Sequence, residues 1–157
     1  MSRDSELRNF DNLACYQHAM KLYNAAYRMA EHLPVHERFN LASQIRRASL
    51  STLLNIAEGY GRFHYLDKLR FFYYARGSLC ETLSAFISAR QANYIDDEQL
   101  AWVRDVETEA EKSLNGYIKF IRSRQQGGEE YGNKLIHDDQ EEYNTSIDEN
   151  NGKSPDR

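Results

Sequence analysis

The stretch NLASQIRRASLSTLLNIAEGYGR, residues 40–62, decides the fold of this chain. Polar residues recur in it every three or four positions, a spacing that keeps side chains on one face of an α-helix. They are Asn40, Gln44, Arg47, Ser51, Asn55, Glu58 and Arg62. Most of the remaining circumference is apolar, whereas a helix on the surface of a monomer needs an apolar arc of only about 100°. We therefore expect this helix to be buried on two sides, either by its own bundle and a second subunit or within a larger bundle.

Two neighbouring segments also have the apolar spacing of helices. The first covers about residues 13–32 and ends before Pro34, because the residue preceding a proline disfavours the helical conformation. The second covers about residues 65–93. A glycine inside a helix is unfavourable by roughly 1 kcal/mol relative to alanine. We therefore expect Gly77, in the interior of the second segment, to permit close contact with another helix.

A fourth helix has the clearest start in the sequence. Asp96 is a suitable N-cap, and Gln99 three residues later completes a capping box. An apolar stripe then continues to Ile121. The helix of residues 40–62 has an equally plain end, since Gly59 and Gly61 are residue types that close helices. No segment shows the period-two alternation of a strand. The sequence predicts an all-α fold, an antiparallel up-down four-helix bundle.

Charge divides the chain into two parts. Residues 1–125 contain 17 Lys and Arg against 15 Asp and Glu, a net charge of +2, and residues 126–157 contain 3 against 9, a net charge of −6. The second part has too few apolar residues to offset its chain entropy by burial. We therefore expect residues 1–125 to form the bundle and residues 126–157 to be a disordered acidic tail.

The sequence offers little catalytic chemistry. No glutamate has a histidine three residues later, as carboxylate-bridged metal bundles require. His32 and His36 have the spacing of a zinc pair, but Pro34 between them should break the helix, so we expect surface or turn histidines. Cys15 and Cys80 are expected to be reduced, buried thiols. We expect no enzyme activity, no metal and no cofactor.

Targeting signals are also absent from the sequence. No cationic N-terminus precedes an apolar stretch, and no run approaches the roughly 18 apolar residues of a membrane span. We expect a cytoplasmic protein without a membrane partner.

The polar stripe has two interpretations. In the first, its charges form a buried network that fixes the register of the bundle. Arg47 and Glu58 lie about three turns apart, roughly 16 Å, and cannot pair with each other. Arg47 would then pair with Glu81, and Glu58 with Arg62 or Arg76. The predicted network comprises Arg47, Asn55, Glu58, Arg76 and Glu81.

In the second interpretation, arginines of this region bind phosphate groups. Of the 17 basic residues up to position 125, 13 are arginine, the side chain suited to bidentate phosphate contacts and to aromatic stacking. The candidates for nucleic-acid binding are Arg46, Arg47, Arg62 and Arg70.

Several short motifs resemble a known family. They are Gln44-Ile45-Arg46-Arg47-Ala48, then Asn55-Ile56-Ala57-Glu58-Gly59 with Gly61-Arg62, then Ala75-x-Gly77-Ser78-Leu79-x-Glu81. In this order they resemble the four-helix bundle proteins encoded within intervening sequences of bacterial 23S rRNA genes, over about residues 10–121. The resemblance implies homo-oligomers, commonly pentameric barrels. A related branch, the accessory proteins of diversity-generating retroelements, binds nucleic acid and a reverse transcriptase.

The chain departs from this family at three positions. Tyr16 stands where the family often has tryptophan, and Leu53 where it often has proline. Phe63 or His64 stands where it often has a serine cap, which leaves Asp67 as the nearby acceptor for the start of the third helix.

Together, the residues and the resemblance predict a homo-oligomeric bundle that binds RNA or another nucleic acid, with a reverse transcriptase as a partner in the related branch. Assembly would strengthen a modest charge, because five copies of +2 give +10. The main alternative is a protein-interaction scaffold that binds no nucleic acid. A bundle enzyme would instead require a deep pocket with a strongly shifted titratable group.

Overall fold

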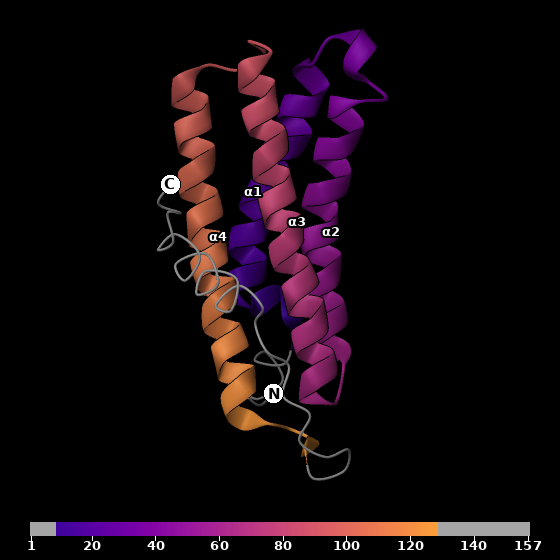
Figure 1. Ribbon diagram of the computed structural model, residues 1–157, viewed down its shortest axis with the longest axis vertical. Coiled ribbons are helices and arrows are strands. Elements are labelled where there is room, and N and C mark those ends of the chain that lie inside the picture. Colours follow the sequence, from indigo (N-terminus) through magenta and orange to yellow (C-terminus); the bar gives the residue numbers. More distant parts are fainter. Residues whose placement is uncertain (1–8, 129–157) are drawn as a thin grey trace, which may run out of the picture.

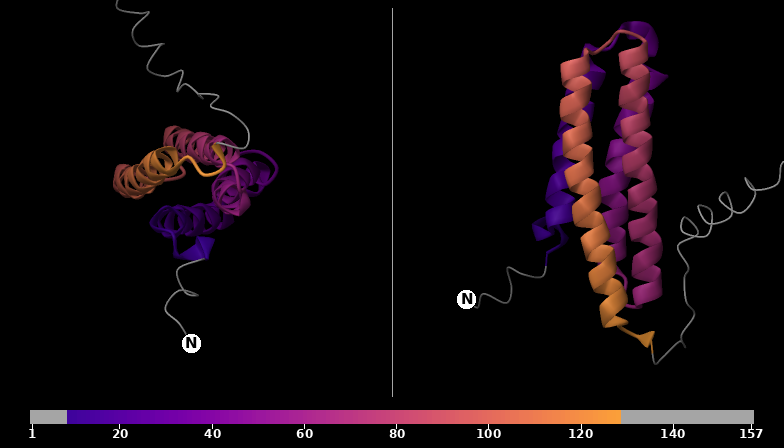
Figure 2. Two further views of the ribbon diagram at one scale, coloured as in Figure 1. Left: turned by 90° about the horizontal axis from the view of Figure 1, so that it is seen from below. Right: turned by 60° about the vertical axis from the view of Figure 1, so that its left-hand side comes forward.

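The chain forms four long antiparallel helices (Figure 1), as the computed structural model shows for residues 9–128. They are α1 (Ala14–His32), α2 (Leu41–Gly61), α3 (Tyr65–Gln91) and α4 (Asp97–Arg124), with short 3₁₀ turns at Phe10–Asn12 and Val35–Glu37. Both α1 and α3 pack against α2 and against α4, so the end-on view shows a four-sided bundle (Figure 2). The predicted all-α up-down bundle is confirmed. Residues 129–157 of the predicted tail lie outside the described part of the chain.

The core runs along the axis between the helices. Its largest side chains have at most 1% of their surface exposed, and they come from all four helices: Leu22, Ile45, Ile56, Leu69, Phe72, Leu79 and Leu114. Burying one such side chain stabilises the fold by roughly 1.5–3 kcal/mol. Helices α2 and α3 form the most extensive pair. The apolar stripes predicted from the sequence therefore face one another.

The close approach of α2 and α3 depends on Gly59. A Cβ atom at this position would lie 2.7 Å from Cε2 of Phe72 and 3.1 Å from Cβ of Phe71. A Cβ at Gly77 would meet nothing within 4 Å, and Gly77 is exposed. The expectation that Gly77 permits close helix contact was therefore wrong. Gly59, which we had assigned to the end of the helix, has this packing role.

Helix α3 begins with a cap that the sequence analysis did not identify. Nδ1 of His64 accepts a hydrogen bond from the backbone N–H of Leu66, at 3.2 Å. His64 itself is buried, and its ring stacks on Tyr65 with centroids 5.2 Å apart. The ring of His64 thus caps α3, a role for which the sequence had offered Asp67 as the nearby acceptor.

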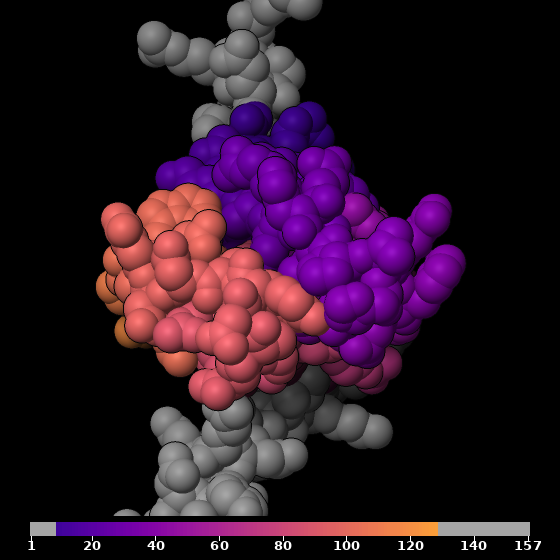
Figure 3. Space-filling view, turned by 90° about the horizontal axis from the view of Figure 1, so that it is seen from above, coloured from indigo at the N-terminus to yellow at the C-terminus, as the bar shows by residue number. Residues whose placement is uncertain are grey.

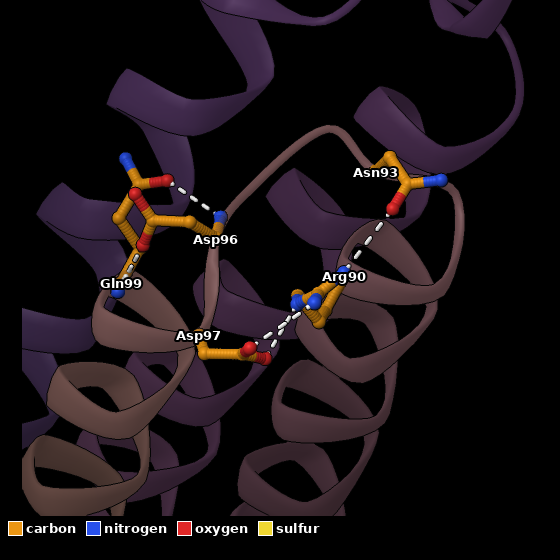
Figure 4. Close-up of polar contacts among 5 residues, drawn as sticks. All are labelled: Arg90, Asn93, Asp96, Asp97 and Gln99. Atoms are coloured by element: carbon orange, nitrogen blue, oxygen red, sulfur yellow. Dashed lines mark hydrogen bonds and ion pairs between the residues drawn. The ribbon is translucent and has the colours of Figure 1, made fainter.

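The predicted capping box of α4 is confirmed (Figure 4). Oδ1 of Asp96 accepts from the backbone N–H of Gln99 at 2.7 Å, and Oε1 of Gln99 accepts from the N–H of Asp96 at 2.9 Å. Arg90 reaches across from the end of α3 and binds both carboxylate oxygens of Asp97, at 2.6 and 3.2 Å. These hydrogen bonds, followed by the charge of Arg90, lower the pKa of Asp97.

Replacing Asp96 with alanine should lower the free energy of unfolding by about 1 kcal/mol, within the 0.5–2 kcal/mol range for N-caps, because the backbone N–H of Gln99 loses its partner. Thermal denaturation followed by circular dichroism measures the change. Asp105→Ala, on an exposed position in the middle of α4, is the control and should change stability by less than about 0.5 kcal/mol. Equal effects of the two substitutions would contradict the capping role.

The α1–α2 connection and the α3–α4 turn meet at one end of the bundle, which Figure 3 shows from above. The hydroxyl of Tyr94 donates to Oε1 of Glu37 at 3.0 Å and lies 3.1 Å from Nε2 of His36. Glu37 also accepts from the backbone N–H of Leu41, and this hydrogen bond is the main reason that its pKa is lowered. Glu37 therefore holds the start of α2 and joins the two connections.

The opposite end is closed by the residues that follow α4. Gln125 has a left-handed backbone with φ of 47°, and Gly127 follows with φ of 79°. The chain turns back here, so the backbone N–H of Tyr65 donates to the carbonyl oxygen of Gln126 at 2.9 Å. A Cβ on Gly127 would lie 3.1 Å from the ring of His64. Residues 126–128, which we had assigned to the tail, thus pack against the start of α3.

Candidate nucleic-acid interface

The polar stripe of α2 lies on the surface of the chain. Asn40, Gln44, Arg47, Glu58 and Arg62 are exposed, and Ser51 and Asn55 are half-buried. On one side of the stripe the helix is buried against its own bundle. On the other side Leu50 and Leu54 remain 36% and 59% exposed. The single chain therefore buries one side of this helix, as expected. The second side is an exposed apolar edge in the single chain.

Polar side chains link this stripe to α3. Nε2 of Gln44 donates to Oε1 of Glu81 at 2.5 Å. The hydroxyls of Ser51 and Ser78 lie 2.9 Å apart, and Nδ2 of Asn55 donates back to the carbonyl oxygen of Ser51 at 2.8 Å. Gln44 and Ser51 thus connect α2 to α3, through the carboxylate of Glu81 and the hydroxyl of Ser78, and these two contacts fix the register of the helices.

The ion pair that we predicted between Arg47 and Glu81 is not formed among the described residues, because Glu81 accepts from Gln44 instead. Glu58 does pair with Arg62, one of its two predicted partners. Both of these side chains are about half exposed. The other candidate, Arg76, turns toward α4, where Nη1 donates to Oδ1 of Asn115 at 3.3 Å. The predicted buried network is therefore wrong: its charges are divided between two faces, and most are solvated.

Exposure changes what we expect from substitutions here. Arg47→Ala and Glu81→Ala should each lower the free energy of unfolding by less than about 1 kcal/mol, and their effects should add, since exposed charges contribute little. A buried pair would instead lose about 3–5 kcal/mol when one partner is removed. Urea denaturation of both single variants and the double variant measures the coupling. A coupling above about 1 kcal/mol would show that the two charges interact after all.

Two of the four candidate arginines lie beside aromatic rings. The guanidinium carbon of Arg62 is 4.8 Å from the ring centroid of Phe71, and that of half-buried Arg46 is 5.7 Å from the ring of Tyr27. Arg47 and Arg70 are exposed on α2 and α3. Such a ring holds a guanidinium in place while leaving its N–H groups able to bind an oxyanion. The structure thus brings Arg47, Arg62 and Arg70 to the α2 and α3 surface and places Arg46 on the side of α2 that faces α1.

Two hollows follow the exposed edge of α2. One, of about 350 Å³, is lined by Arg47, Leu50, Ser51, Leu54, Asn55 and Glu81, together with Ala48. The other, of about 720 Å³, is lined by Leu54, Ala57, Glu58, Gly61 and Arg62. Leu54 lines both. We call this surface the α2 edge, defined by Arg47, Leu50, Leu54, Glu58 and Arg62.

A family profile described as 23S rRNA-intervening sequence protein matches residues 11–116, which include three of the four helices and most of α4. The chain belongs to this family. The resemblance drawn from the sequence motifs is thereby confirmed.

A solved structure supports the assignment at the level of the fold. It is the crystal structure of a protein of unknown function from the S23 ribosomal protein family of Bacteroides thetaiotaomicron. It has a TM-score of 0.63 and 22% sequence identity with this chain, over 70% of this chain and 98% of that one. Comparison with curated proteins gives no match.

Burial shifts the pKa of two titratable side chains in the core. Within residues 9–128, no group of three or more His, Cys, Asp and Glu side chains is placed to hold a metal ion. Glu107 on α4 is buried, and desolvation followed by the charge of Glu111 raises its pKa. Burial also raises the pKa of the Cys15 thiol, to about 11. Cys80 is exposed, so the expectation of a buried thiol is wrong there.

The predicted surface or turn positions of His32 and His36 agree with the structure. His32 and His36 are both exposed, and Nδ1 of His32 lies 2.7 Å from the carbonyl oxygen of Arg28. In the part of the chain that the structure describes, no helix is long and apolar enough to span a membrane.

The sequence pattern predicted a second apolar side on α2, but it did not show which residues form the exposed edge. Leu50 and Leu54 entered the sequence analysis as part of a buried circumference, and Tyr74 on α3, 55% exposed, was not considered. A helical pattern shows which residues share a face, but it does not show which face meets another helix of the same chain. The signal that was present is the four-residue spacing of Leu50 and Leu54 next to charged residues.

Proposed function

We propose that this protein is a non-enzymatic homo-oligomer that binds RNA or another nucleic acid through arginines displayed on the assembled bundles. The observation that carries the proposal is the α2 edge, where exposed leucines and exposed arginines share one helix face. The leucines would bury against a second copy, and the arginines would remain at the rim for phosphate groups.

The self-association part rests on the apolar surface. Leu54 is 59% exposed between two hollows, and Tyr74 is 55% exposed on the adjoining helix α3. An interface commonly has an apolar centre with a polar rim, and here Arg47 and Glu58 flank the leucines along the helix. Because the rim has both signs of charge, copies of the same surface could pair without net repulsion.

The nucleic-acid part rests on guanidinium groups next to aromatic rings. Arg62 over Phe71 and Arg46 over Tyr27 give this arrangement on α2. Arg62 also pairs with Glu58, so a phosphate would have to replace that carboxylate. A reverse transcriptase, as in the branch related to the family that the motifs resemble, is a candidate protein partner.

Binding to RNA and DNA should weaken steeply as salt concentration rises, because each neutralised phosphate releases counterions. We expect Arg47→Gln and Arg70→Gln to weaken binding to all sequences alike and to flatten the salt slope by about one unit per lost phosphate contact. Fluorescence anisotropy with labelled single-stranded RNA and DNA, titrated with KCl, measures both. Arg104→Gln, an exposed arginine on α4, is the matched control.

Deleting residues 129–157, which hold the whole net charge of −6 of the acidic segment, should tighten binding at low salt by removing a competitor for the basic surface. If neither the full chain nor this shortened chain binds RNA or DNA at about 50 mM salt, where the attraction is strong, the nucleic-acid proposal is wrong. The alternative, a protein-interaction scaffold, would then be favoured.

A further inference from the structure

A cavity of about 430 Å³ lies between the start of α3 and the end of α4, at the end of the bundle away from the α3–α4 turn. It lies within the roughly 300–1,000 Å³ of small-molecule sites. Its walls include three aromatic rings, from Tyr65, Tyr117 and Phe120, and two cations, Lys68 and Arg124. We call it the end cavity. It lies apart from the α2 edge and shares no lining residue with either hollow there.

The first cation of the end cavity is partly buried. Nζ of Lys68 donates to the carbonyl oxygen of Tyr60 at 3.2 Å and lies 5.9 Å from the ring centroid of that residue. Desolvation lowers the pKa of Lys68. Within residues 9–128 no carboxylate pairs with this ammonium. An anion that enters the cavity would therefore stabilise this desolvated ammonium, which has no counterion among those residues.

The second cation stands against an aromatic wall. The guanidinium carbon of Arg124 is 5.2 Å from the ring centroid of Phe120. Phe120 in turn stacks on Tyr117, with centroids 5.8 Å apart and planes at 26°. Burial raises the pKa of Tyr117 to about 12, so its hydroxyl stays neutral at physiological pH. The lining therefore combines flat apolar faces with two positive charges.

Among residues 9–128, the lining of the end cavity contains no Asp or Glu. The hollows of the α2 edge contain Glu58 or Glu81, and the other large cavity, near Trp102 at the opposite end of the bundle, contains Glu98. Of these four sites, the end cavity is the one in which an anionic ligand meets no carboxylate from the part of the chain that the structure describes.

We propose that the end cavity binds a nucleoside monophosphate group, with the base against the ring of Phe120 and the phosphate between Lys68 and Arg124. Aromatic rings accept bases by stacking, whatever the base. Lys and Arg together bind phosphate oxygens through charge-assisted hydrogen bonds. Two kinds of molecule present this same nucleoside monophosphate group: a free mononucleotide and the 5′-phosphorylated end of a single strand. The strand source rests on the proposed nucleic-acid function, whereas the mononucleotide source does not.

Calorimetry on the full chain tests the site with adenosine 5′-monophosphate and with adenosine. We expect the phosphorylated compound to bind at least about tenfold more tightly, because adenosine leaves both cations without an anion. Arg124→Gln and Phe120→Ala should each weaken its binding by about tenfold. Both side chains are at the surface, and Phe120 is 49% exposed, so both variants should keep the helical circular dichroism of the parent.

Matched controls lie on the same helix. Arg104→Gln removes an exposed cation and Trp102→Ala removes an aromatic side chain that is 48% exposed, both far along α4 from the end cavity. Neither should change the affinity for adenosine 5′-monophosphate by more than about twofold. An equal loss in the controls and in the cavity variants would overturn the site, because the binding would then be diffuse attraction to the surface.

Oligoadenylates with a 5′-phosphate and a 5′-hydroxyl separate the two sources. Tighter binding of the phosphorylated strand, lost in Arg124→Gln, assigns the cavity to strand ends. Binding of the mononucleotide with no preference between the strands assigns it to free nucleotides. No binding of adenosine 5′-monophosphate at about 5 mM overturns the proposal, even if long RNA still binds through the α2 edge. Loss of RNA binding alone overturns only the proposed function.

Discussion

Replacing Leu54 with aspartate should convert the proposed oligomer into monomers. Leu54 is 59% exposed at the centre of the α2 edge and lines both of its hollows. In an assembled interface the new carboxylate would be buried without a partner, at a cost of several kcal/mol for each contact between subunits. In a closed ring this cost recurs at every interface. Light scattering should show a multimer for the parent chain and a mass near the 18.4 kDa of one chain for the variant.

The folding of the single chain should survive this substitution. Because the side chain is largely exposed in the isolated bundle, aspartate there should change its stability by less than about 1 kcal/mol, including its weaker helix propensity. Circular dichroism should therefore show full helicity. Phe39→Asp is the matched control, since Phe39 is 88% exposed in the α1–α2 connection and away from the α2 edge. It should leave the oligomer intact.

Loss of assembly should also weaken nucleic-acid binding. Five copies of a bundle with net charge +2 attract a strand as +10, whereas a single copy contributes +2. A Leu54→Asp variant that stays multimeric would show that the α2 edge is not the interface. A parent chain that is monomeric at micromolar concentration would contradict the oligomer proposal itself.

The sequence was sufficient for features that depend on residues close together in the chain. The capping box of Asp96 and Gln99 and the pairing of Glu58 with Arg62 involve residues three or four positions apart on one helix. Local spacing determines such contacts once the segment is helical. The order and direction of the four helices followed from the same periodicity together with short connections.

Features that depend on how two helices meet could not be obtained in this way. Glu81 accepts a hydrogen bond from Gln44 and does not pair with Arg47. Predicting this choice requires knowing how α2 and α3 are aligned, and a shift of one residue between them would change the partner. The same applies to the contacts of Gly59 with the ring of Phe72 and with Cβ of Phe71. The end cavity joins Lys68 to Arg124, 56 positions later in the chain, and no local pattern connects them.

Replacing Gly59 with alanine should lower the free energy of unfolding by about 1–3 kcal/mol, although alanine is the better helix former by roughly 1 kcal/mol. The added Cβ would lie 2.7 and 2.8 Å from two ring carbons of Phe72, closer than van der Waals contact allows. Phe72 is fully buried, so its ring cannot move away without disturbing the core. The contact with Cβ of Phe71, at 3.1 Å, limits the shift of α3 as a whole.

The other helical glycines supply controls with the opposite sign. A Cβ at Gly77 or at Gly116 would meet nothing within 4 Å, so Gly77→Ala and Gly116→Ala should raise the stability by about 0.5–1 kcal/mol through helix propensity alone. Urea denaturation of the three variants gives the comparison. Gly77 and Gly116 lie on different helices. An equal gain in the free energy of unfolding at both positions would therefore not come from contacts between subunits on one surface. A Gly59→Ala variant as stable as these two would mean that α2 and α3 are not held in close contact through this glycine.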